Sequence, residues 1–372
     1  SAAGKKYRLH VEYLAHFFGK QPVPTEAQRF EIPYHDYLMA PLQPLKDHLE
    51  SKTYETFEKD TVKYEKYSEA VAKCLTDKKR LLGNAKITVM VLGAGRGPLV
   101  RSCLAAAVES GADIEVFAVE KNPNAVLALE SRVRENGWDN VTIVREDIRS
   151  WEPTRKADVI VSELLGSFGD NELSPECLDS AERFLKPNGV SIPSSCTSFI
   201  APLASEKLHN EVKTLGESMS GYETPYVVSV HRGMVISPSK DCFTFFHPKK
   251  SASGPLATGG GIGEDNSRHR TIGFVVPEAN VLHGFVGYFE ATLYKDVKIS
   301  TRPETRTPDM FSWFPLYIPI RNPMNITKEG ECRLEIWRRV EPSRVWYEWA
   351  VSTPEPSGIH NPNGRSYSMA LD

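Results

Sequence analysis

Val89-Met90-Val91-Leu92-Gly93-Ala94-Gly95-Arg96-Gly97-Pro98 is the stretch that decides the fold. Its apolar, β-branched beginning predicts a buried strand, and the three alternating glycines predict a tight turn. Pro98 and the apolar-rich pattern from Leu99 to Val108 predict that a helix begins directly after the turn, because proline suits the first turn of a helix. Glycines also let a ligand lie against the backbone with no side chain in the way. The stretch therefore predicts a nucleotide-type binding loop between a strand and a helix.

The glycine spacing indicates what kind of ligand the loop takes. A dinucleotide fingerprint is Gly-x-Gly-x-x-Gly, but here the pattern is Gly-x-Gly-x-Gly and Pro98 occupies the last position. A ligand without a phosphate is therefore favoured over a pyrophosphate. Glu120 agrees with this, because it ends the next predicted strand, Ile114–Val119, where a carboxylate can accept both ribose hydroxyls of an adenosine. For the glycines taken alone, an ordinary turn is the alternative.

Strand and helix patterns alternate after the loop, which predicts a Rossmann-like parallel sheet with helices on both faces. The predicted elements are a helix over 123–136, strands over 141–144 and 157–162, a helix from Pro175, a turn over 186–189 and a strand over 190–192. The glycine loop, Glu120, Asp147 and Glu163 all follow strands of this sheet. Ligands of such sheets bind at the carboxyl ends of the strands, so we expect these residues to share a site.

Past residue 193 the pattern changes to alternating runs separated by turns, which predicts an antiparallel β-barrel or sandwich. The runs are 197–203, 226–230, 242–246, 271–276, 281–293, 297–301, 332–340 and 344–351. The Gly- and Ser-rich stretch 251–266 predicts a surface loop. We divide the chain into a linker helix and extended segment (1–34), a Rossmann-like domain (35–192) and a β-barrel domain (193–372). The chain starts without an initiator methionine, so we expect a piece of a longer protein.

Composition excludes several classes of protein. The 372 residues carry a net charge of −3 with a pI near 6.4, so no basic surplus points to bulk nucleic-acid binding. No apolar run reaches membrane-spanning length and no signal-peptide pattern is present. The six cysteines form no C-x-x-C pair, which favours unpaired thiols in a reducing compartment over disulfides or a zinc site.

The segment Ser162–Glu176 carries the chemistry, because Glu163 and Glu172 flank a glycine-containing loop at a strand end. If the loop folds back, both carboxylates reach one pocket, where they could bind a metal, act as acid and base, or hold a cation. A metal is disfavoured because no dense Asp, Glu or His cluster surrounds them. Helix capping is the alternative, and it suits Ser174 and Glu176. It does not explain Glu163 at the end of an apolar strand.

Two aromatic stretches are ambiguous. Met310-Phe311-Ser312-Trp313-Phe314-Pro315 offers flat surface that suits stacking on a planar cation such as guanidinium. The alternative is barrel core, which we favour for Phe311 and Phe314. For residues 53–64, dense in aromatics, an amphipathic helix with an aromatic core face is the preferred interpretation.

Several motifs together resemble the protein arginine methyltransferases, and within them the symmetric-dimethylating (type II) class. They are Val-Leu-Gly-Ala-Gly-Arg-Gly-Pro, Val-Glu-Lys-Asn-Pro-Asn-Ala, Ser-Glu-Leu-Leu-Gly-Ser-Phe with Asp-Asn-Glu-Leu-Ser-Pro-Glu, and Phe-Ser-Trp-Phe-Pro. The resemblance covers the chain from about residue 36 onward. It implies S-adenosyl-L-methionine as methyl donor, with S-adenosyl-L-homocysteine as product, and protein arginine as acceptor, giving monomethyl- and symmetric dimethylarginine.

The resemblance also implies roles for individual residues. The donor-binding residues would be Tyr54, Lys63, Gly93, Gly95, Glu120, Asp147 and Ile148. Glu163 and Glu172 would hold the guanidinium as the catalytic pair, and Leu42, Phe57 and Trp313 would wall the arginine channel. In asymmetric-product relatives a methionine takes the Phe57 position, and a histidine-containing loop replaces Phe-Ser-Trp-Phe.

For partners, the resemblance implies arginine- and glycine-rich protein substrates such as histone tails and RNA-processing proteins, and a homo-oligomer. It also implies a WD-repeat partner, docked through an N-terminal domain that this chain lacks. We expect no direct nucleic-acid binding and no membrane, and a place in the cytoplasm and nucleus. A nucleic-acid methyltransferase is an alternative, but no Asn-Pro-Pro-Tyr motif or Pro-Cys nucleophile is present. A non-catalytic donor-binding scaffold is another, although a scaffold needs no pair of glutamates.

Overall fold

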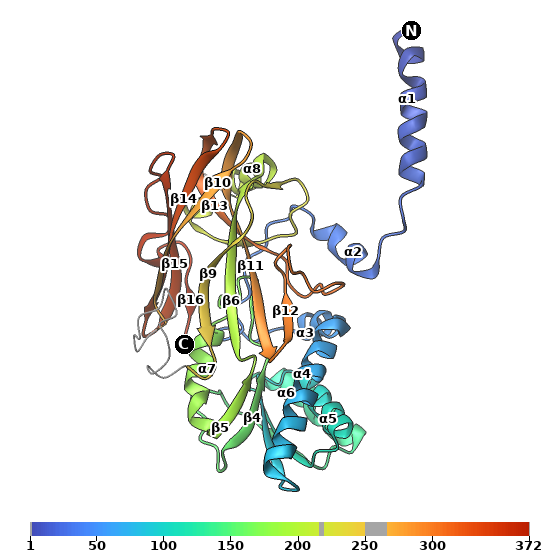
Figure 1. Cartoon of the computed structure of the whole chain (residues 1–372), viewed down its shortest axis with the longest axis vertical. Helices are drawn as coiled ribbons and strands as arrows, with labels where there is room; N and C mark the ends of the chain where they lie inside the picture. Colours follow the sequence, from blue (N-terminus) through green and yellow to red (C-terminus); the bar gives the residue numbers. More distant parts are fainter. Residues whose placement is uncertain (1, 216–218, 250–265, 372) are drawn as a thin grey trace.

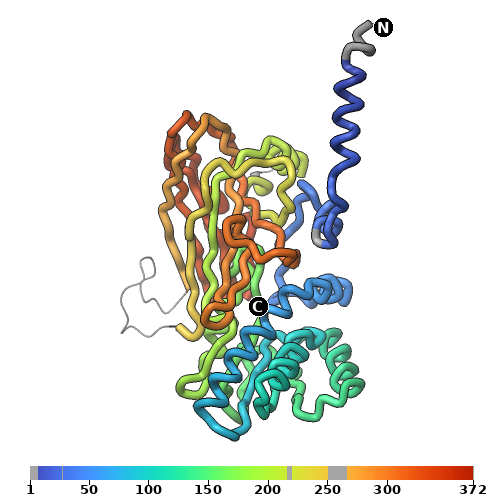
Figure 2. The backbone as a smooth tube through the Cα atoms, turned by 45° about the vertical axis from the view of Figure 1, so that its right-hand side comes forward, coloured from blue at the N-terminus to red at the C-terminus, as the bar shows by residue number. Residues whose placement is uncertain are grey.

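The computed structural model describes residues 2–215, 219–249 and 266–371. A parallel sheet with its helices forms one end of the molecule and antiparallel strands form the other, while α1 (Ala2–Gly19) extends away from both (Figures 1 and 2). The predicted fold class is thus confirmed. The surface loop predicted over 251–266 lies, except for Asn266, outside the described residues. Within the described residues, no helix has the length and apolarity needed to cross a membrane.

The parallel sheet has five strands in the order β3-β2-β1-β4-β5, and every neighbouring pair is parallel. The strands are β1 (Ile87–Leu92), β2 (Ile114–Val119), β3 (Val141–Val144), β4 (Ala157–Ser162) and β5 (Leu185–Ile192). The strand order reverses between β1 and β4. In open α/β sheets this switch point is where loops diverge and leave a crevice at the carboxyl ends.

Both faces of this sheet are covered because its buried strands alternate apolar side chains between two cores. Val89 and Val91 pack with residues of α4 (Thr61–Leu82) and α5 (Pro98–Ser110). Met90 and Leu92 face the opposite core, which includes Leu178 of α7. The bounds of the helices around the sheet are α3 Ser51–Glu58, α6 Pro123–Asn136, α7 Ser174–Ala181 and the 3₁₀ turn η2 Glu182–Phe184.

The amphipathic helix preferred for residues 53–64 is wrong in this form. The chain makes two helices there, because Asp60 adopts a non-helical backbone and its side chain accepts the Lys63 N–H, which caps the start of α4. α3 ends at Glu58 and has no buried residue, so its aromatic side chains form no core face. They lie at a cavity described below.

The residues of the turn predicted over 186–189 lie within the bounds of β5, but they have no partner on β4, and pairing resumes at Val190, where the next strand was predicted. The pairing of β5 with β4 shifts in register between Ala157 and Val159, so this stretch is a bulge. Asn188 there has φ +64°, a left-handed backbone that asparagine tolerates. The turn residues therefore bend the strand without ending it.

The remaining strands form two antiparallel sheets that share a core. One has the order β10-β14-β15-β16, and the other has the order β7-β13-β11-β6-β8, with β9 on β6 and β12 on β11. The strands are β6 (Ser195–Ala204), β7 (Tyr226–Val227), β8 (Met234–Val235), β9 (Lys240–Phe246), β10 (Arg268–Val276), β11 (Asn280–Tyr294), β12 (Val297–Ser300), β13 (Leu316–Ile326), β14 (Gly330–Glu341), β15 (Arg344–Thr353) and β16 (Met369–Ala370). Other short elements are α2 (Glu26–Glu31), η1 (Ile32–Tyr34), α8 (Glu206–Thr214), η3 (Met219–Glu223) and η4 (Pro362–Gly364).

The two ends of the molecule share one apolar core. Phe289 and Leu293 of β11, and Ile299 of β12, belong to the same cluster of buried side chains as Tyr67 and Leu75 of α4. α4 therefore packs on the parallel sheet and on the antiparallel strands at once. This joint brings the loop 311–314, which lies directly before β13, close to the carboxyl edge of the parallel sheet.

Candidate active site

A cavity of about 490 Å³ lies at the carboxyl edge of the parallel sheet, beside its switch point. Its walls come from α3, the start of α4, the glycine loop, and the segments that follow β2, β3 and β4. The loop 311–314 closes it from the antiparallel part. All twelve site residues expected from the sequence line this one cavity: Leu42, Tyr54, Phe57, Lys63, Gly93, Gly95, Glu120, Asp147, Ile148, Glu163, Glu172 and Trp313.

The glycine loop presents bare backbone to the cavity. Gly93 and Gly95 have φ of +71° and +53°, which residues with a side chain rarely adopt. A Cβ atom on Gly93 would lie 2.8 Å from Leu164 Cδ2, and one on Gly95 would lie 3.1 Å from Tyr54 Cε1. A side chain at either position would thus occupy the space next to the glycine loop, so glycine is required for space as well as for the backbone angle.

Glu120, directly after β2, is buried at the floor of the cavity. Its Oε2 accepts the Gly95 N–H at 2.7 Å and its Oε1 accepts the Asn122 N–H at 2.7 Å. Burial raises the pKa of Glu120, and these backbone donors oppose that rise. Each oxygen keeps a further lone pair, so the carboxylate can accept two more hydrogen bonds from the cavity side.

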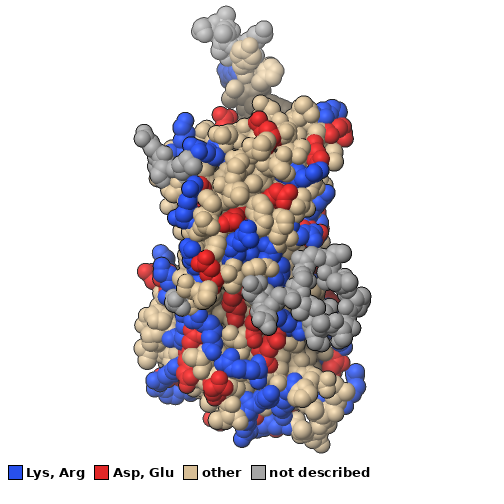
Figure 3. Space-filling view, turned by 90° about the vertical axis from the view of Figure 1, so that its left-hand side faces the viewer, with Lys and Arg blue, Asp and Glu red and all other residues tan. Residues whose placement is uncertain are grey.

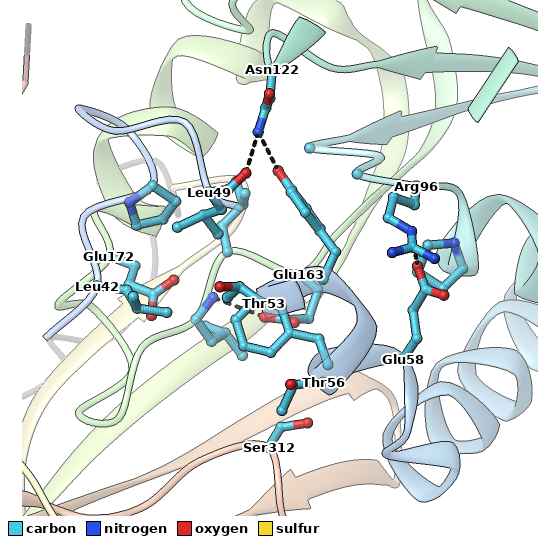
Figure 4. Close-up of a pocket in the computed structure, with 18 of the residues that line it drawn as sticks. Leu42, Leu49, Thr53, Thr56, Glu58, Arg96, Asn122, Glu163, Glu172 and Ser312 are labelled. Carbon is cyan, nitrogen blue, oxygen red and sulfur yellow. Dashed lines mark hydrogen bonds and ion pairs between the residues drawn. The ribbon is translucent and has the colours of Figure 1, made fainter. Parts of the chain in front are cut away.

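Asn122, close to Glu120, forms hydrogen bonds to the segment that carries Leu49 and Tyr54. Its Nδ2 donates to the Leu49 carbonyl at 3.0 Å and to the Tyr54 hydroxyl at 3.3 Å (Figure 4). Burial, assisted by the charge of Glu120, raises the pKa of Tyr54 to about 12, so the phenol is neutral near pH 7. The ring of Tyr54 is thereby held against the glycine loop.

Asp147 and Ile148 follow β3 and complete this half of the cavity. Burial acts to raise the pKa of Asp147, but the Arg149 guanidinium and backbone N–H outweigh it, and the pKa is lowered. Arg149 reaches both oxygens, with Nε 3.0 Å from Oδ1 and Nη2 2.9 Å from Oδ2. Asp147 is therefore an anion of fixed orientation, and Ile148 supplies a buried apolar surface beside it.

The other half of the cavity holds the glutamate pair. Glu163 Oε2 lies 2.9 Å from Lys63 Nζ, and its Oε1 accepts the Leu165 N–H at 3.2 Å. The Lys63 side chain is 1% exposed; burial alone would lower its pKa, but Glu163 and its neighbours raise it, so it stays charged. Glu172 lies across the cavity from the Arg96–Glu58 ion pair (Figure 4). No described residue donates a hydrogen bond to the Glu172 carboxylate, and burial together with the charge of Glu163 raises its pKa well above the usual range.

Helix capping does not account for the end of this loop. The residue that precedes α7 is Leu173, and no side chain caps the helix. Ser174 Oγ instead lies 3.5 Å from the Gly169 carbonyl, and Glu176 pairs with Arg338. The capping role expected for Ser174 and Glu176 is therefore wrong.

Aromatic rings surround the Lys63 ammonium. Its Nζ lies 5.3 Å from the ring centre of Phe57 and 4.9 Å from those of Tyr64 and Trp313. Trp313 Nε1 donates to the Leu165 carbonyl at 2.7 Å, which fixes the indole beside the loop that carries the glutamates. Rings at these distances attract a cation, so this part of the cavity favours positive charge.

The barrel-core interpretation holds for Phe311 only in part, and for Phe314 it is wrong. Both rings line the cavity and pack against Phe30, at 4.9 Å and 6.1 Å between ring centres. Phe311 is buried, whereas Phe314 is half-buried and also contacts Tyr34. Leu42 is 38% exposed at the rim of the same cavity.

Sequence reasoning missed Asp60, which joins the cavity walls. Its Oδ2 accepts the N–H groups of Phe311 and Ser312 at 3.0 and 2.8 Å and the Ser312 hydroxyl at 2.7 Å, while Oδ1 accepts the Lys63 N–H at 3.2 Å. The available signal was an aspartate directly before a helical run, which is an N-cap pattern. Nothing in the sequence indicated that it would also anchor a loop 250 residues away. Over the described part of the chain, no three or more His, Cys, Asp or Glu side chains are grouped so as to hold a metal ion.

Comparison with known proteins agrees with this geometry. Residues 25–192 match the family model described as PRMT5 arginine-N-methyltransferase, and residues 195–369 match the PRMT5 oligomerisation domain. Protein arginine N-methyltransferase 5 of Oryza sativa subsp. indica is 50% identical over 97% of this chain and 55% of its own length. The Xenopus laevis protein of the same name is 48% identical over 97% of this chain and 57% of its own length. The chain thus spans little more than half the length of these relatives.

A solved structure supports the fold at lower identity. The Trypanosoma brucei PRMT1 enzyme-prozyme complex with AdoHcy has a TM-score of 0.65 and 14% identity, covering 84% of this chain and 96% of that one. The strand order, the cavity at the switch point and the two family matches, which together extend over most of the sequence, lead to one assignment. The chain belongs to the protein arginine N-methyltransferase family, in its PRMT5 group.

Proposed function

We propose that this chain transfers methyl groups from S-adenosyl-L-methionine to guanidinium nitrogens of protein arginine, giving monomethyl- and symmetric dimethylarginine. The observation that carries the proposal is the pair Glu163 and Glu172 facing the same cavity as Glu120 and the glycine loop. One half of the cavity suits an adenosine, and the other half suits a cation.

The donor half fits a nucleoside that carries no phosphate. Glu120 has lone pairs free for two ribose hydroxyls, and the bare backbone of Gly93 and Gly95 allows close approach. Ile148 offers an apolar surface and Asp147 a fixed acceptor, as an adenine and its amino group require. When bound, the donor supplies an electrophilic methyl carbon on a sulfonium.

The acceptor half of the cavity can reduce the repulsion between two cations. A sulfonium and a guanidinium whose pKa exceeds ~12 would repel each other in a site shielded from water. Glu163 and Glu172 supply two negative charges, accept guanidinium N–H bonds and orient one nitrogen toward the methyl carbon for in-line displacement. Burial and the charge of Glu163 raise the pKa of Glu172, and a guanidinium beside it would lower that pKa again, so that Glu172 is ionised when the acceptor is bound.

Lys63 has a part in this arrangement. Its ammonium neutralises Glu163 and lies among the rings of Phe57, Tyr64 and Trp313. We propose that a guanidinium entering the cavity meets this same carboxylate and these rings. The walls formed by Leu42, Phe57 and Trp313 then confine a narrow alkyl chain such as that of arginine.

The test is direct. The chain is incubated with methyl-labelled donor and a glycine-arginine-rich peptide, and the product is hydrolysed to amino acids and separated. Labelled monomethyl- and symmetric dimethylarginine are expected, with no label on a matched peptide that carries lysine at each arginine. In a parallel incubation with nucleic acid in place of the peptide, label on the nucleic acid would favour a nucleic-acid methyltransferase. S-adenosyl-L-homocysteine binding without any labelled amino acid would favour a non-catalytic scaffold.

The face drawn in Figure 3 and the net charge offer little support for the nucleic-acid alternative. On the face drawn in Figure 3, Lys and Arg side chains are interspersed with Asp and Glu side chains. The net charge of −3 agrees with this mixture. Proteins that bind nucleic acid in bulk present a basic face, so a protein acceptor is favoured.

We expect Phe57→Met to change the ratio of dimethylarginine products. The Phe57 ring is rigid and lines the same cavity as the glutamate pair, with its centre 5.3 Å from Lys63 Nζ, so it should force a monomethylated arginine to present its unmodified terminal nitrogen. Methionine is flexible and should relax this exclusion, so that some asymmetric product forms. Phe117→Met, on β2 and outside the cavity, is the control. Purely symmetric product at full rate from Phe57→Met would contradict the steric explanation.

The wider setting is also part of the proposal. The match to an oligomerisation domain suggests a homo-oligomer, and arginine- and glycine-rich proteins such as histone tails and RNA-processing proteins are the proposed substrates. The relatives are longer than this chain, which is compatible with an N-terminal domain that docks a WD-repeat partner. All six cysteines are buried and unpaired, as is usual in the reducing cytoplasm and nucleus.

A further inference from the structure

A buried arginine from the antiparallel part reaches the loop that carries the glutamates. Arg338 lies on β14 and its side chain is 0% exposed. Its Nε is 2.5 Å from Asp170 Oδ2, and its Nη1 and Nη2 are 2.7 and 2.9 Å from the two oxygens of Glu176. Asp170 and Glu176 lie two residues before and four residues after Glu172. The arginine thus forms ion pairs with the loop on both sides of Glu172.

Further hydrogen bonds give the loop a single arrangement. Asp170 Oδ2 also accepts the Tyr347 hydroxyl at 2.7 Å, and Asp170 Oδ1 lies 3.0 Å from Ser198 Oγ. Asn171 Oδ1 accepts the Phe168 N–H at 2.7 Å. A Cβ atom on Gly166 would lie only 2.4–2.6 Å from the Asn171 side-chain amide, so the loop packs against itself with no spare room.

Charge is divided between the two sides of the loop. Residues 163–176 contain four carboxylates, of which Asp170 and Glu176 are paired with Arg338 and Glu163 is paired with Lys63. Glu172 accepts no hydrogen bond from a described residue and faces the cavity. Arg338 therefore pairs with both carboxylates behind the loop and offsets one of their two charges, while the Glu172 carboxylate at the front is left for a ligand.

We infer that Arg338 is a positioning residue for methyl transfer, which acts through Asp170 and Glu176 to hold the Glu172 carboxylate at the acceptor nitrogen. This inference rests on the proposed function. A buried ion network could also serve stability alone, and the two roles differ in what they predict. A positioning role predicts a loss of turnover that exceeds any loss of donor binding. The reason is that Glu120 and the glycine loop are not among the residues that Arg338 holds.

Arg338→Lys keeps the charge but cannot grip Asp170 and Glu176 at once. We expect its kcat to fall by about 10²-fold, as a 1 Å displacement of a reacting group can cause. Its affinity for S-adenosyl-L-homocysteine, measured by calorimetry, should stay within about twofold of the unaltered chain. Arg339→Lys is the matched control, because Arg339 is the next residue of β14 and its exposed side chain pairs with Glu348 rather than with the loop.

Two further variants separate charge from geometry. Arg338→Met leaves Asp170 and Glu176 less neutralised, so the pKa of Glu172 should rise further and the acidic limb of the kcat/KM profile should move to higher pH. The other charged or titratable groups around Glu172 are Glu163, Lys63 and Tyr367. Arg338→Met/Glu176→Gln restores the net charge. The acidic limb of its kcat/KM profile should therefore return to the pH of the unaltered chain, while kcat stays low.

The outcomes are distinct. Wild-type kcat in Arg338→Lys and in the charge-balanced variant, with only the melting temperature lowered, would assign Arg338 to stability and overturn the inference. An equal loss of donor affinity and kcat would also overturn it, since Arg338 would then act on the whole cavity. If Arg338→Met fails to fold, the other two variants still decide. If the unaltered chain does not methylate arginine, the proposed function itself fails.

Discussion

Glu163→Gln and Glu172→Gln are each expected to lower kcat by about 10²–10³-fold, the usual loss when one preorganised transition-state contact is removed. Glutamine keeps the shape and much of the hydrogen-bonding capacity of glutamate, so the change isolates the negative charge. Without that charge, two cations meet less well neutralised in a site that is shielded from water, and the amide NH2 presents a donor where the guanidinium needs an acceptor. Affinity for S-adenosyl-L-homocysteine should barely change, because Glu120 lies in the other half of the cavity.

The two losses should not add. Either substitution leaves the guanidinium poorly neutralised and wrongly oriented, so the double variant should be little slower than the worse single one. We would measure the single-turnover rate and the thermal melt of each variant. Glu109→Gln, on the exposed side of α5, is the control. A near-normal rate in either single variant, with donor bound, would refute the mechanism. Loss of a helix cap would instead cost ~1 kcal/mol of stability and leave the rate intact.

Glu120→Ala should abolish most donor binding. The substitution removes two acceptors for ribose hydroxyls, and charge-assisted hydrogen bonds of this kind contribute about 1.5–3 kcal/mol each. It also leaves the N–H groups of Gly95 and Asn122 without their acceptor, so the loop that should cradle the donor loses its support. We therefore expect S-adenosyl-L-homocysteine to bind about 10²-fold more weakly or worse.

Calorimetry with matched variants measures this effect. Glu120→Gln keeps one carbonyl acceptor and should lie between Ala and the unaltered chain, and Glu109→Ala should bind normally. Because burial raises the pKa of Glu120, donor affinity should begin to fall on acidification at a higher pH than an exposed carboxylate would give, and Glu120→Ala should lose that dependence. Unchanged affinity in Glu120→Ala would refute the ribose assignment.

Local patterns predicted the part of the site that the parallel sheet builds. The strand before Gly93, the helix after Pro98 and the strand ending at Glu120 follow from apolar periodicity and glycine placement, and all are confirmed. Once the sheet is parallel, its carboxyl ends must share an edge, which is why Glu120, Asp147 and Glu163 lie at one cavity.

Other features could not be predicted because they depend on distant contacts. β13 is not among the predicted strands. It contains Pro319 and Pro323, and proline normally argues against a paired strand. Asp60 and Arg338 act on residues far along the chain, and no local spacing reveals such a partner. The aromatic side chains of α3 resemble a core stripe, and only the folded chain shows that they face a cavity instead.

The apolar cluster shared by α4, β11 and β12 has a consequence for how the protein melts. A cut near residue 193 would separate Tyr67 and Leu75 from Phe289 and Ile299, and each piece would expose the surface it now buries. Although two separate family models match the two parts, we therefore expect neither part to fold on its own. Scanning calorimetry should show a single cooperative endotherm for the chain, and the active site, built across that joint, should be lost in the same transition.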